Sequence, residues 1–274
     1  MPRALILRTA GTNCDAEMVR AFALAGAAPE LVHVDRLIAE PQRLDSFDLI
    51  GFPGGFSYGD DIASGRILAM KLRERLYPAL RAAAQRGALM IGACNGFQVL
   101  VQVGLLPGPR AGQPWPEDRP PEQSLSLSDN IGARFVDRWV GVEPARDSVC
   151  IWTQGLGDYL GDRPADRRDA MQLPVAHGEG RLVARSPEIL RDLAAGRQIA
   201  LRYTDNYNGS QDAIAGVCDP SGRIFGLMPH PERYLEWTRH PYWTRLTPAL
   251  RKEETPGLLV FRNAVEAARA APVA

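Results

Sequence analysis

Short apolar runs alternate with helical segments through the first hundred residues, and this alternation constrains the fold more than any other feature of the sequence. The apolar runs cover residues 4–8, 29–34, 48–55 and 88–93. Apolar residues at helical spacing cover 15–27, 65–85 and 95–104. Strands buried on both faces of a parallel sheet are short, continuous apolar runs, and helices connect them. The pattern therefore predicts an α/β fold with an open, mostly parallel sheet flanked by helices.

Further strand-like runs in the second half of the chain predict an antiparallel extension of this sheet. They lie at 134–142, 148–152, 173–178, 199–203, 212–219 and 223–230. The sequence DPSG at 219–222 places a turn between the last two runs, which indicates a hairpin. Near the end of the chain, Thr255 can cap a helix whose first position is Pro256.

Two stretches without apolar periodicity predict loops that are inserted into a single domain covering residues 1–274. Residues 107–123 contain six prolines, and proline lacks the N–H group that a helix interior or a central strand requires. Residues 155–172 are predominantly polar. We interpret both stretches as surface insertions and not as linkers between two domains.

Charge and composition exclude several classes of protein. The 32 Lys and Arg residues equal the 32 Asp and Glu residues in number, so net charge offers no basis for binding nucleic acid or an anionic membrane. The first apolar run is too short for a signal peptide, and no later run is long enough to span a bilayer. The four cysteines form no C-x-x-C pair, which disfavours a metal site and a disulfide framework. We therefore expect a cytoplasmic protein without a metal.

Cys94 lies between Gly92 and Gly96, directly after an apolar run and before a helical stretch. This G-x-C-x-G arrangement is a nucleophile elbow with cysteine in place of serine. The nucleophile of such an elbow sits on a strained turn, and side chains two residues away on either side would collide with neighbouring backbone. The adjoining helix N-terminus favours a thiolate. The alternative is a buried structural cysteine, but the run, the paired glycines and the helix together favour a nucleophile.

A thiolate nucleophile needs a base and a group that orients the base. His230 follows an apolar run and is flanked by prolines, and Glu232 lies two residues further on. In extended backbone these two side chains would lie on one side, so Glu232 can reach the imidazole. His177 is the alternative base, with Glu179 at the same spacing. Because a Gly-x-Gly sequence follows His177, its segment is more typical of a loop that contacts a ligand, and we favour His230.

Acyl chemistry also requires donors that stabilise an oxyanion. Gly54 and Gly55 follow the third apolar run, where backbone N–H groups are free to face a substrate. The second donor of an elbow is the N–H group after the nucleophile, which here belongs to Asn95. One such donor typically contributes about 10²–10³-fold in rate. The Gly54-Gly55 turn and Asn95 are therefore the candidate oxyanion donors.

Taken together, the motifs of the chain resemble those of the class I triad glutamine amidotransferases, and within that group the glutaminase subunits of phosphoribosylformylglycinamidine synthase. The matching motifs are GTNCD (11–15), PGGFSYGDD (53–61), GACNGFQVL (92–100), GLLPG (104–108), AHGEG (176–180), NGS (208–210) and GLMPHPER (226–233). The resemblance implies a flavodoxin-like sheet and the same Cys94, His230 and Glu232 triad. It implies Gly55 and Asn95 as the donors to the oxyanion. The residues that it places against the glutamine substrate are Gly54, Gln98 and His177.

The resemblance also implies partners. Ammonia released from L-glutamine would reach a synthetase subunit that converts formylglycinamide ribonucleotide to formylglycinamidine ribonucleotide with ATP, in a complex that includes a small third subunit. The chain contains no G-x-x-x-x-G-K-[ST] sequence. ATP and Mg²⁺ are therefore expected on the synthetase, and no cofactor is expected on this chain.

Two other functions stay open at the level of the sequence. One is a related enzyme, either a glutaminase that serves a different synthetase or a cysteine hydrolase on a similar sheet. The other is a non-catalytic scaffold that keeps the fold for binding, although the presence of Cys94, His230 and Glu232 argues against it.

Overall fold

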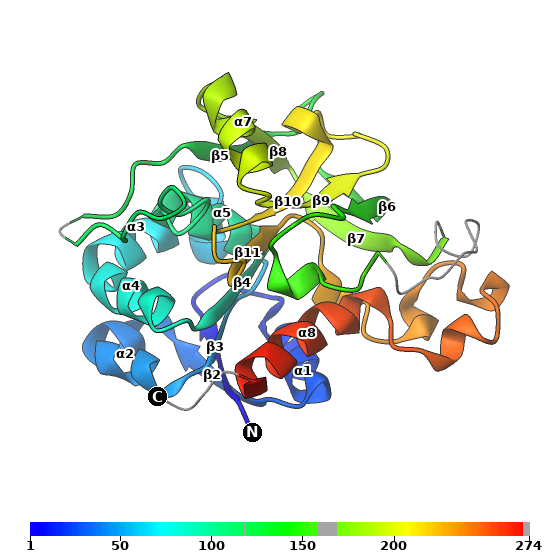
Figure 1. Ribbon diagram of the computed structural model, residues 1–274, viewed down its shortest axis with the longest axis horizontal. Coiled ribbons are helices and arrows are strands. Elements are labelled where there is room, and N and C mark those ends of the chain that lie inside the picture. The colour runs from blue at the N-terminus through cyan, green and yellow to red at the C-terminus, as the bar shows by residue number, and fades with distance from the viewer. Residues whose placement is uncertain (118, 158–168, 271–274) are drawn as a thin grey trace.

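The computed structural model describes residues 1–117, 119–157 and 169–270, and within them one nine-stranded sheet carries helices on both faces (Figure 1). Its strands are, in spatial order, β2 (Ala28–His33), β1 (Arg3–Arg8), β3 (Leu49–Phe52), β4 (Leu89–Ala93), β11 (Ile224–Leu227), β10 (Ile214–Cys218), β9 (Ile199–Tyr203), β6 (Val136–Pro144) and β7 (Gln172–His177). A separate antiparallel pair consists of β5 (Leu125–Asp129) and β8 (Glu179–Ala184).

The strand directions confirm the predicted fold class. Neighbours from β2 to β11 pair in parallel, and the remaining neighbours from β11 to β7 pair antiparallel. The register joins Phe52 of β3 to Gly92 of β4, and Ala93 of β4 to Leu227 of β11. The segments that leave the carboxyl ends of these three strands therefore begin side by side, at the edge where open α/β sheets bind ligands.

Helices form two layers, one on each face of the parallel strands (Figure 1). α1 (Asp15–Ala25) and α8 (Pro256–Ala270) cover one face. The other face carries α2 (Val34–Ala39), α3 (Arg66–Arg75), α4 (Tyr77–Gln85) and α5 (Asn95–Val103), and α7 (Pro187–Ala195) packs outside β8.

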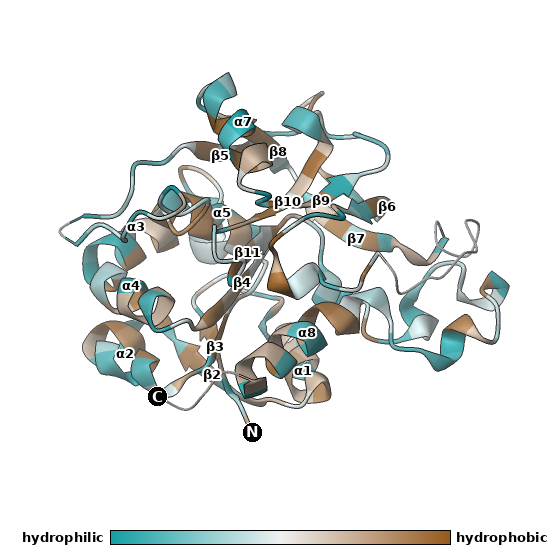
Figure 2. Cartoon of the chain, viewed as in Figure 1, coloured by the Kyte–Doolittle hydropathy of each residue, from teal (hydrophilic) through white to brown (hydrophobic). Residues whose placement is uncertain are grey.

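Successive side chains of each strand point to opposite faces of the sheet, which divides the core between the two helix layers. In β1, Ile6 faces the cluster around Phe22 and Phe261, whereas Leu5 and Leu7 face the opposite cluster. The rings of Phe22 and Phe261 pack edge to face with centroids 5.1 Å apart, which joins α1 to α8. Figure 2 shows hydrophobic residues along the central strands and hydrophilic ones on the outer turns of α7.

Several local predictions hold and others are wrong. The hairpin at DPSG joins β10 to β11, and Thr255 accepts a hydrogen bond from the Leu258 N–H group at the start of α8. The helix predicted over 65–85 is two helices that break at Leu76, because Pro78 lacks an N–H group and begins a new helix. The strand predicted at 148–152 is instead a 3₁₀ turn, since a short buried apolar run does not distinguish these states.

Other elements were not predicted from the sequence at all. These are α2, α7 and the β5–β8 pair, which are short or only half apolar. In the proline-rich stretch at 107–123 the described residues form neither helix nor strand, as expected of a loop. Most of the second predicted loop, residues 158–168, lies outside the described part of the chain. Within that part, no helix combines the length and apolar character needed to cross a membrane.

Candidate active site

Cys94 occupies a strained turn between β4 and α5. Its φ is +52° and its ψ is −111°, a conformation that costs a non-glycine residue about 1–3 kcal/mol and is concentrated at functional sites. The side chain is buried but borders a pocket. This is the geometry expected of an elbow that presents a nucleophile at a helix N-terminus.

The two glycines around Cys94 are required by close backbone approach. A Cβ atom on Gly96 would lie 1.8 Å from the carbonyl oxygen of Phe52, and one on Gly92 would lie 2.6 Å from the Gly96 carbonyl. Both distances are far below van der Waals contact. The steric explanation of the G-x-C-x-G pattern is therefore confirmed.

Gly54, which follows β3, brings the elbow and the predicted base together. A Cβ atom on Gly54 would lie 2.6 Å from Cε1 of His230, 3.3 Å from Cβ of Cys94 and 3.3 Å from Sγ of Cys14. The imidazole thus packs against bare backbone, and both cysteines lie close to the same glycine. This contact joins segments that follow three neighbouring strands.

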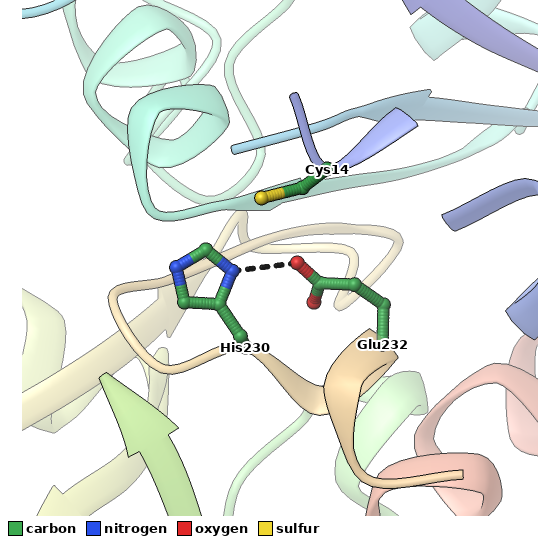
Figure 3. Close-up of side chains that lie close together, drawn as sticks. All are labelled: Cys14, His230 and Glu232. Atoms are coloured by element: carbon green, nitrogen blue, oxygen red, sulfur yellow. Dashed lines mark hydrogen bonds and ion pairs between the residues drawn. The ribbon is translucent and has the colours of Figure 1, made fainter. Parts of the chain in front are cut away.

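His230 and Glu232 form a buried pair (Figure 3). Nδ1 of His230 lies 2.6 Å from Oε1 of Glu232. The contact does not arise from extended backbone, as the sequence suggested, but from a 3₁₀ turn over Pro231–Arg233 that curls the carboxylate back to the ring. An ionised Glu232 carboxylate accepts a hydrogen bond from the Nδ1–H group of His230, which leaves Nε2 as the nitrogen that exchanges protons. Nε2 has no hydrogen-bond partner among the described residues.

The charge state of His230 follows from its neighbours. Burial alone lowers the pKa of His230, but the negative charges of Glu232 and Cys94 oppose that effect. The balance raises the pKa of His230 well above its ordinary value. The site therefore favours the imidazolium form of His230.

A pocket of about 290 Å³ opens next to Cys94. Among the described residues that line it are three acidic side chains and no Lys or Arg. The acidic residues are Asp60, Asp129 and Glu179. Burial raises the pKa of Asp60, and the charge of Glu179 adds to that effect against several hydrogen bonds. A pocket with this lining suits a ligand that carries a cationic group.

The predicted oxyanion and substrate residues surround this pocket. Gly55 and Gln98 line it. Asn95 is the first residue of α5, and a helix offers no acceptor of its own to the N–H group at that position. The Gln98 side chain is already held, because it accepts a hydrogen bond from Asn95 Nδ2 and donates one to the Glu179 carbonyl. Its contact with a substrate stays a prediction.

His177 also borders the pocket, but its surroundings differ from those of His230. Nε2 of His177 lies 2.6 Å from the Tyr207 hydroxyl. Glu179 does not orient it, since that carboxylate faces the Ser64 N–H group. Burial, together with the charge of His230, lowers the pKa of His177 to about 3. A histidine held neutral in this way is a weak base, which favours His230 for that role.

Four residues near the site were not predicted from the sequence. Cys14 and Arg233 lie against the His230–Glu232 pair, Asp60 lines the pocket and Tyr207 contacts His177. The first three lie within the motifs GTNCD, PGGFSYGDD and GLMPHPER. Those motifs marked the segments, but nothing in the sequence separated these side chains from their neighbours.

One cluster has the composition of a metal site. Ligand atoms of Cys14, His230 and Glu232 all lie within 4.8 Å of one another. The Cys14 sulfur already accepts a hydrogen bond from the Arg233 guanidinium, and that positive charge disfavours a metal cation there. The expectation that the chain holds no metal stays a prediction.

Comparison with known proteins finds a matching family model and similar sequences. The family model of the CobB/CobQ-like glutamine amidotransferase domain matches residues 1–266. A phosphoribosylformylglycinamidine synthase subunit PurQ from Dehalococcoides mccartyi is 43% identical, over 97% of this chain and 98% of the relative. The corresponding PurQ protein of Methanococcus maripaludis is 36% identical, over 97% of each chain.

A solved structure agrees with these relatives. A chain in the structure of PurLQS from Thermotoga maritima superposes with a TM-score of 0.68 and 30% sequence identity. The match covers 97% of this chain and 98% of that chain. The similarity thus extends over the whole fold, including the segments that carry Cys94 and His230.

Proposed function

This chain belongs to the CobB/CobQ-like glutamine amidotransferase family, and on that premise we propose that it is the glutaminase subunit of a phosphoribosylformylglycinamidine synthase. It hydrolyses L-glutamine to L-glutamate and ammonia. The ammonia passes to a separate synthetase subunit, which uses ATP to convert formylglycinamide ribonucleotide to formylglycinamidine ribonucleotide. ATP and Mg²⁺ belong to that subunit, and this chain needs no cofactor of its own.

The observation that carries the proposal is the contact around Gly54. Cys94 on its strained elbow and the His230–Glu232 pair meet across a residue without a side chain. Nucleophile, base and orienting carboxylate are the three groups that thiol-based acyl transfer requires.

In the first half of the reaction the Cys94 thiolate attacks the side-chain amide carbon of glutamine. A bond forms between Sγ and that carbon, and the carbonyl oxygen becomes an oxyanion that the N–H groups of Gly55 and Asn95 stabilise. His230, which carries the thiol proton, gives it to the leaving nitrogen as the C–N bond breaks. Ammonia departs and a γ-glutamyl thioester remains on Cys94.

In the second half, water hydrolyses the thioester. Nε2 of His230 removes a proton from the attacking water, and the C–S bond breaks to release glutamate. The released Cys94 thiolate and the protonated His230 are the starting state again. Glu232 keeps the proton on Nδ1 throughout, so Nε2 alone exchanges protons with the reacting groups.

The pocket lining supports an amino acid as the substrate. The carboxylates of Asp60 and Glu179 are placed to attract the α-ammonium group of L-glutamine. Gln98 and His177 line the same pocket.

The remaining expectations follow from this function. The partners are the synthetase subunit and a small third subunit, and the complex works in the cytoplasm. Residues 1–274 form one amidotransferase domain in which 107–123 and 155–172 are insertions.

The experiment that tests the proposal measures ammonia release from L-glutamine by the purified chain together with its synthetase subunit. We expect Cys94→Ala to lower the rate by about 10⁴-fold or more, as loss of a triad nucleophile does elsewhere. Cys218→Ala is the matched control, because it removes a buried thiol that lies in β10. Wild-type rates in Cys94→Ala would disprove the nucleophile assignment.

A second measurement separates this function from that of a glutaminase with another synthetase. The gene should restore growth without purines to a strain that lacks the corresponding glutaminase subunit, and the Cys94→Ala gene should not. Active ammonia release combined with failed complementation would assign the chain to a different complex.

A further inference from the structure

Cys14 is a second thiol beside the catalytic pair, and the mechanism above does not use it. It is the residue directly before α1 and is 1% exposed. Its backbone N–H group donates a hydrogen bond to the carbonyl oxygen of Gly54, at 3.3 Å. Cys14 is therefore tied to the same glycine against which His230 packs.

The sulfur of Cys14 is held on two sides. Nη2 of Arg233 donates a hydrogen bond to Sγ at 3.0 Å, and the thiol donates one to Oδ1 of Asn13 at 3.2 Å. Arg233 belongs to the same 3₁₀ turn as Glu232, and its Nε lies 3.9 Å from Oε1 of Glu17 in α1. The sulfur thus connects the start of α1 to the turn that carries the orienting carboxylate.

Figure 3 shows the Cys14 sulfur directed toward the imidazole of His230, on the side where the ring carries Nδ1 and Cε1. The ring is therefore enclosed by the Gly54 backbone, the Cys14 sulfur and the Glu232 carboxylate. Of the two nitrogens of the His230 ring, only Nε2 has no hydrogen-bond partner among the described residues. A ring enclosed in this way has little freedom to turn Nε2 away from the reacting atoms.

We propose that Cys14 is a positioning residue, which together with Arg233 holds the His230 imidazole so that Nε2 stays directed at Cys94 and its substrate. This inference rests on the proposed glutaminase function. Cys14 forms no bond with substrate and transfers no proton. Without the sulfur, a void would lie beside the ring and the Arg233 guanidinium would lose its acceptor, so both the ring and the turn would gain freedom.

The kinetic test compares Cys14→Ala, Cys14→Ser and Cys218→Ala in ammonia release with the synthetase present. A misplacement near 1 Å can cost about 10²-fold in rate, so we expect Cys14→Ala to lower kcat by about 10-fold to 10²-fold, with KM within about 3-fold. Serine keeps both hydrogen bonds and should restore kcat to within about 3-fold. Cys218→Ala should match the wild type. Equal kcat in Cys14→Ala and Cys218→Ala would overturn the proposal.

A second measurement uses the isolated chain and needs no partner. The rate at which iodoacetamide alkylates Cys94 is followed against pH by mass spectrometry, which distinguishes Cys94 from the other cysteines. Because a loosely held imidazolium stabilises the thiolate less, the midpoint of the curve should move to higher pH in Cys14→Ala and return in Cys14→Ser. A purely structural role would reduce the amount of folded protein and leave the midpoint unchanged.

Arg233→Gln keeps the test decisive if Cys14→Ala does not fold. The Arg233 side chain is one-third exposed, so the substitution removes the donor to Sγ without opening a void in the core. It should lower kcat and move the alkylation midpoint in the same direction as Cys14→Ala. An unchanged midpoint in Arg233→Gln refutes the positioning role. Absence of ammonia release from the wild-type complex would instead refute the glutaminase function itself.

Discussion

Gly54→Ala provides the sharpest test of the active-site geometry, because its closest clash is with the His230 ring. The backbone at Gly54 does not have the positive φ that would strain an alanine. The added methyl group would lie 2.6 Å from Cε1 of His230, whereas it would lie 3.3 Å from Cβ of Cys94. The imidazole is thus the group that must move.

The size of the effect follows from these distances. Carbon atoms in contact are normally about 3.5–4.0 Å apart, so the ring has to shift by about 0.9 Å or more. Its other neighbours, the Glu232 carboxylate and the Cys14 sulfur, oppose that shift. A displacement of 1 Å can cost about 10²-fold in rate, so we expect kcat to fall by about 10-fold to 10²-fold. This corresponds to about 1.4–2.7 kcal/mol of lost transition-state stabilisation.

The assay is steady-state ammonia release from L-glutamine with the synthetase present, together with a thermal unfolding curve for each variant. Gly112→Ala controls for a loss of stability without a clash at the site: nothing lies within 4 Å of the added methyl group, but the backbone φ of +80° strains an alanine. It should lower the unfolding temperature and leave kcat unchanged. We expect KM for glutamine to change by less than about 3-fold in Gly54→Ala, since the pocket wall that faces the α-ammonium group is untouched. If Gly54→Ala keeps kcat within 2-fold of the wild type while folding normally, the inferred contact between His230 and the elbow is wrong.

Two further predictions concern other residues of the pocket. The pKa of His177 is lowered to about 3, chiefly by burial, and its unfolded value is about 6.5. The neutral form therefore contributes stability that is present above about pH 6.5 and is lost as pH falls toward 3, by up to about 1.4 kcal/mol per pH unit. His177→Leu should flatten this slope in urea unfolding between pH 7 and pH 5, and an unchanged slope would contradict the assignment. His230, whose raised pKa has the opposite effect, is present in both proteins and cancels in the comparison. Asp60→Asn should raise KM for L-glutamine about 10-fold with kcat nearly unchanged, because it weakens binding of the α-ammonium group in ground state and transition state alike. A lowered kcat at constant KM would show instead that Asp60 supports the elbow through Asn95, to which it is hydrogen-bonded.

The sequence by itself determined the features that depend on short stretches of chain. The parallel strands and their helices follow from local apolar periodicity. The elbow follows from the five consecutive residues that begin at Gly92 and end at Gly96. The pairing of His230 with Glu232 was also predicted, since the two residues lie within one turn, although the backbone there is a 3₁₀ turn and not extended.

Only the tertiary structure decided which distant groups meet. Gly54, Cys94 and His230 come from different parts of the chain and are brought together because β3, β4 and β11 are neighbours in the sheet. The same is true of Cys14, whose sulfur reaches Arg233 across 219 positions of sequence. The physical reason to prefer His230 over His177 as the base is also found only in the tertiary structure. There, burial and neighbouring charges shift the pKa values of the two imidazoles in opposite directions. Such surroundings are set by packing between segments, and no local pattern of residues encodes them.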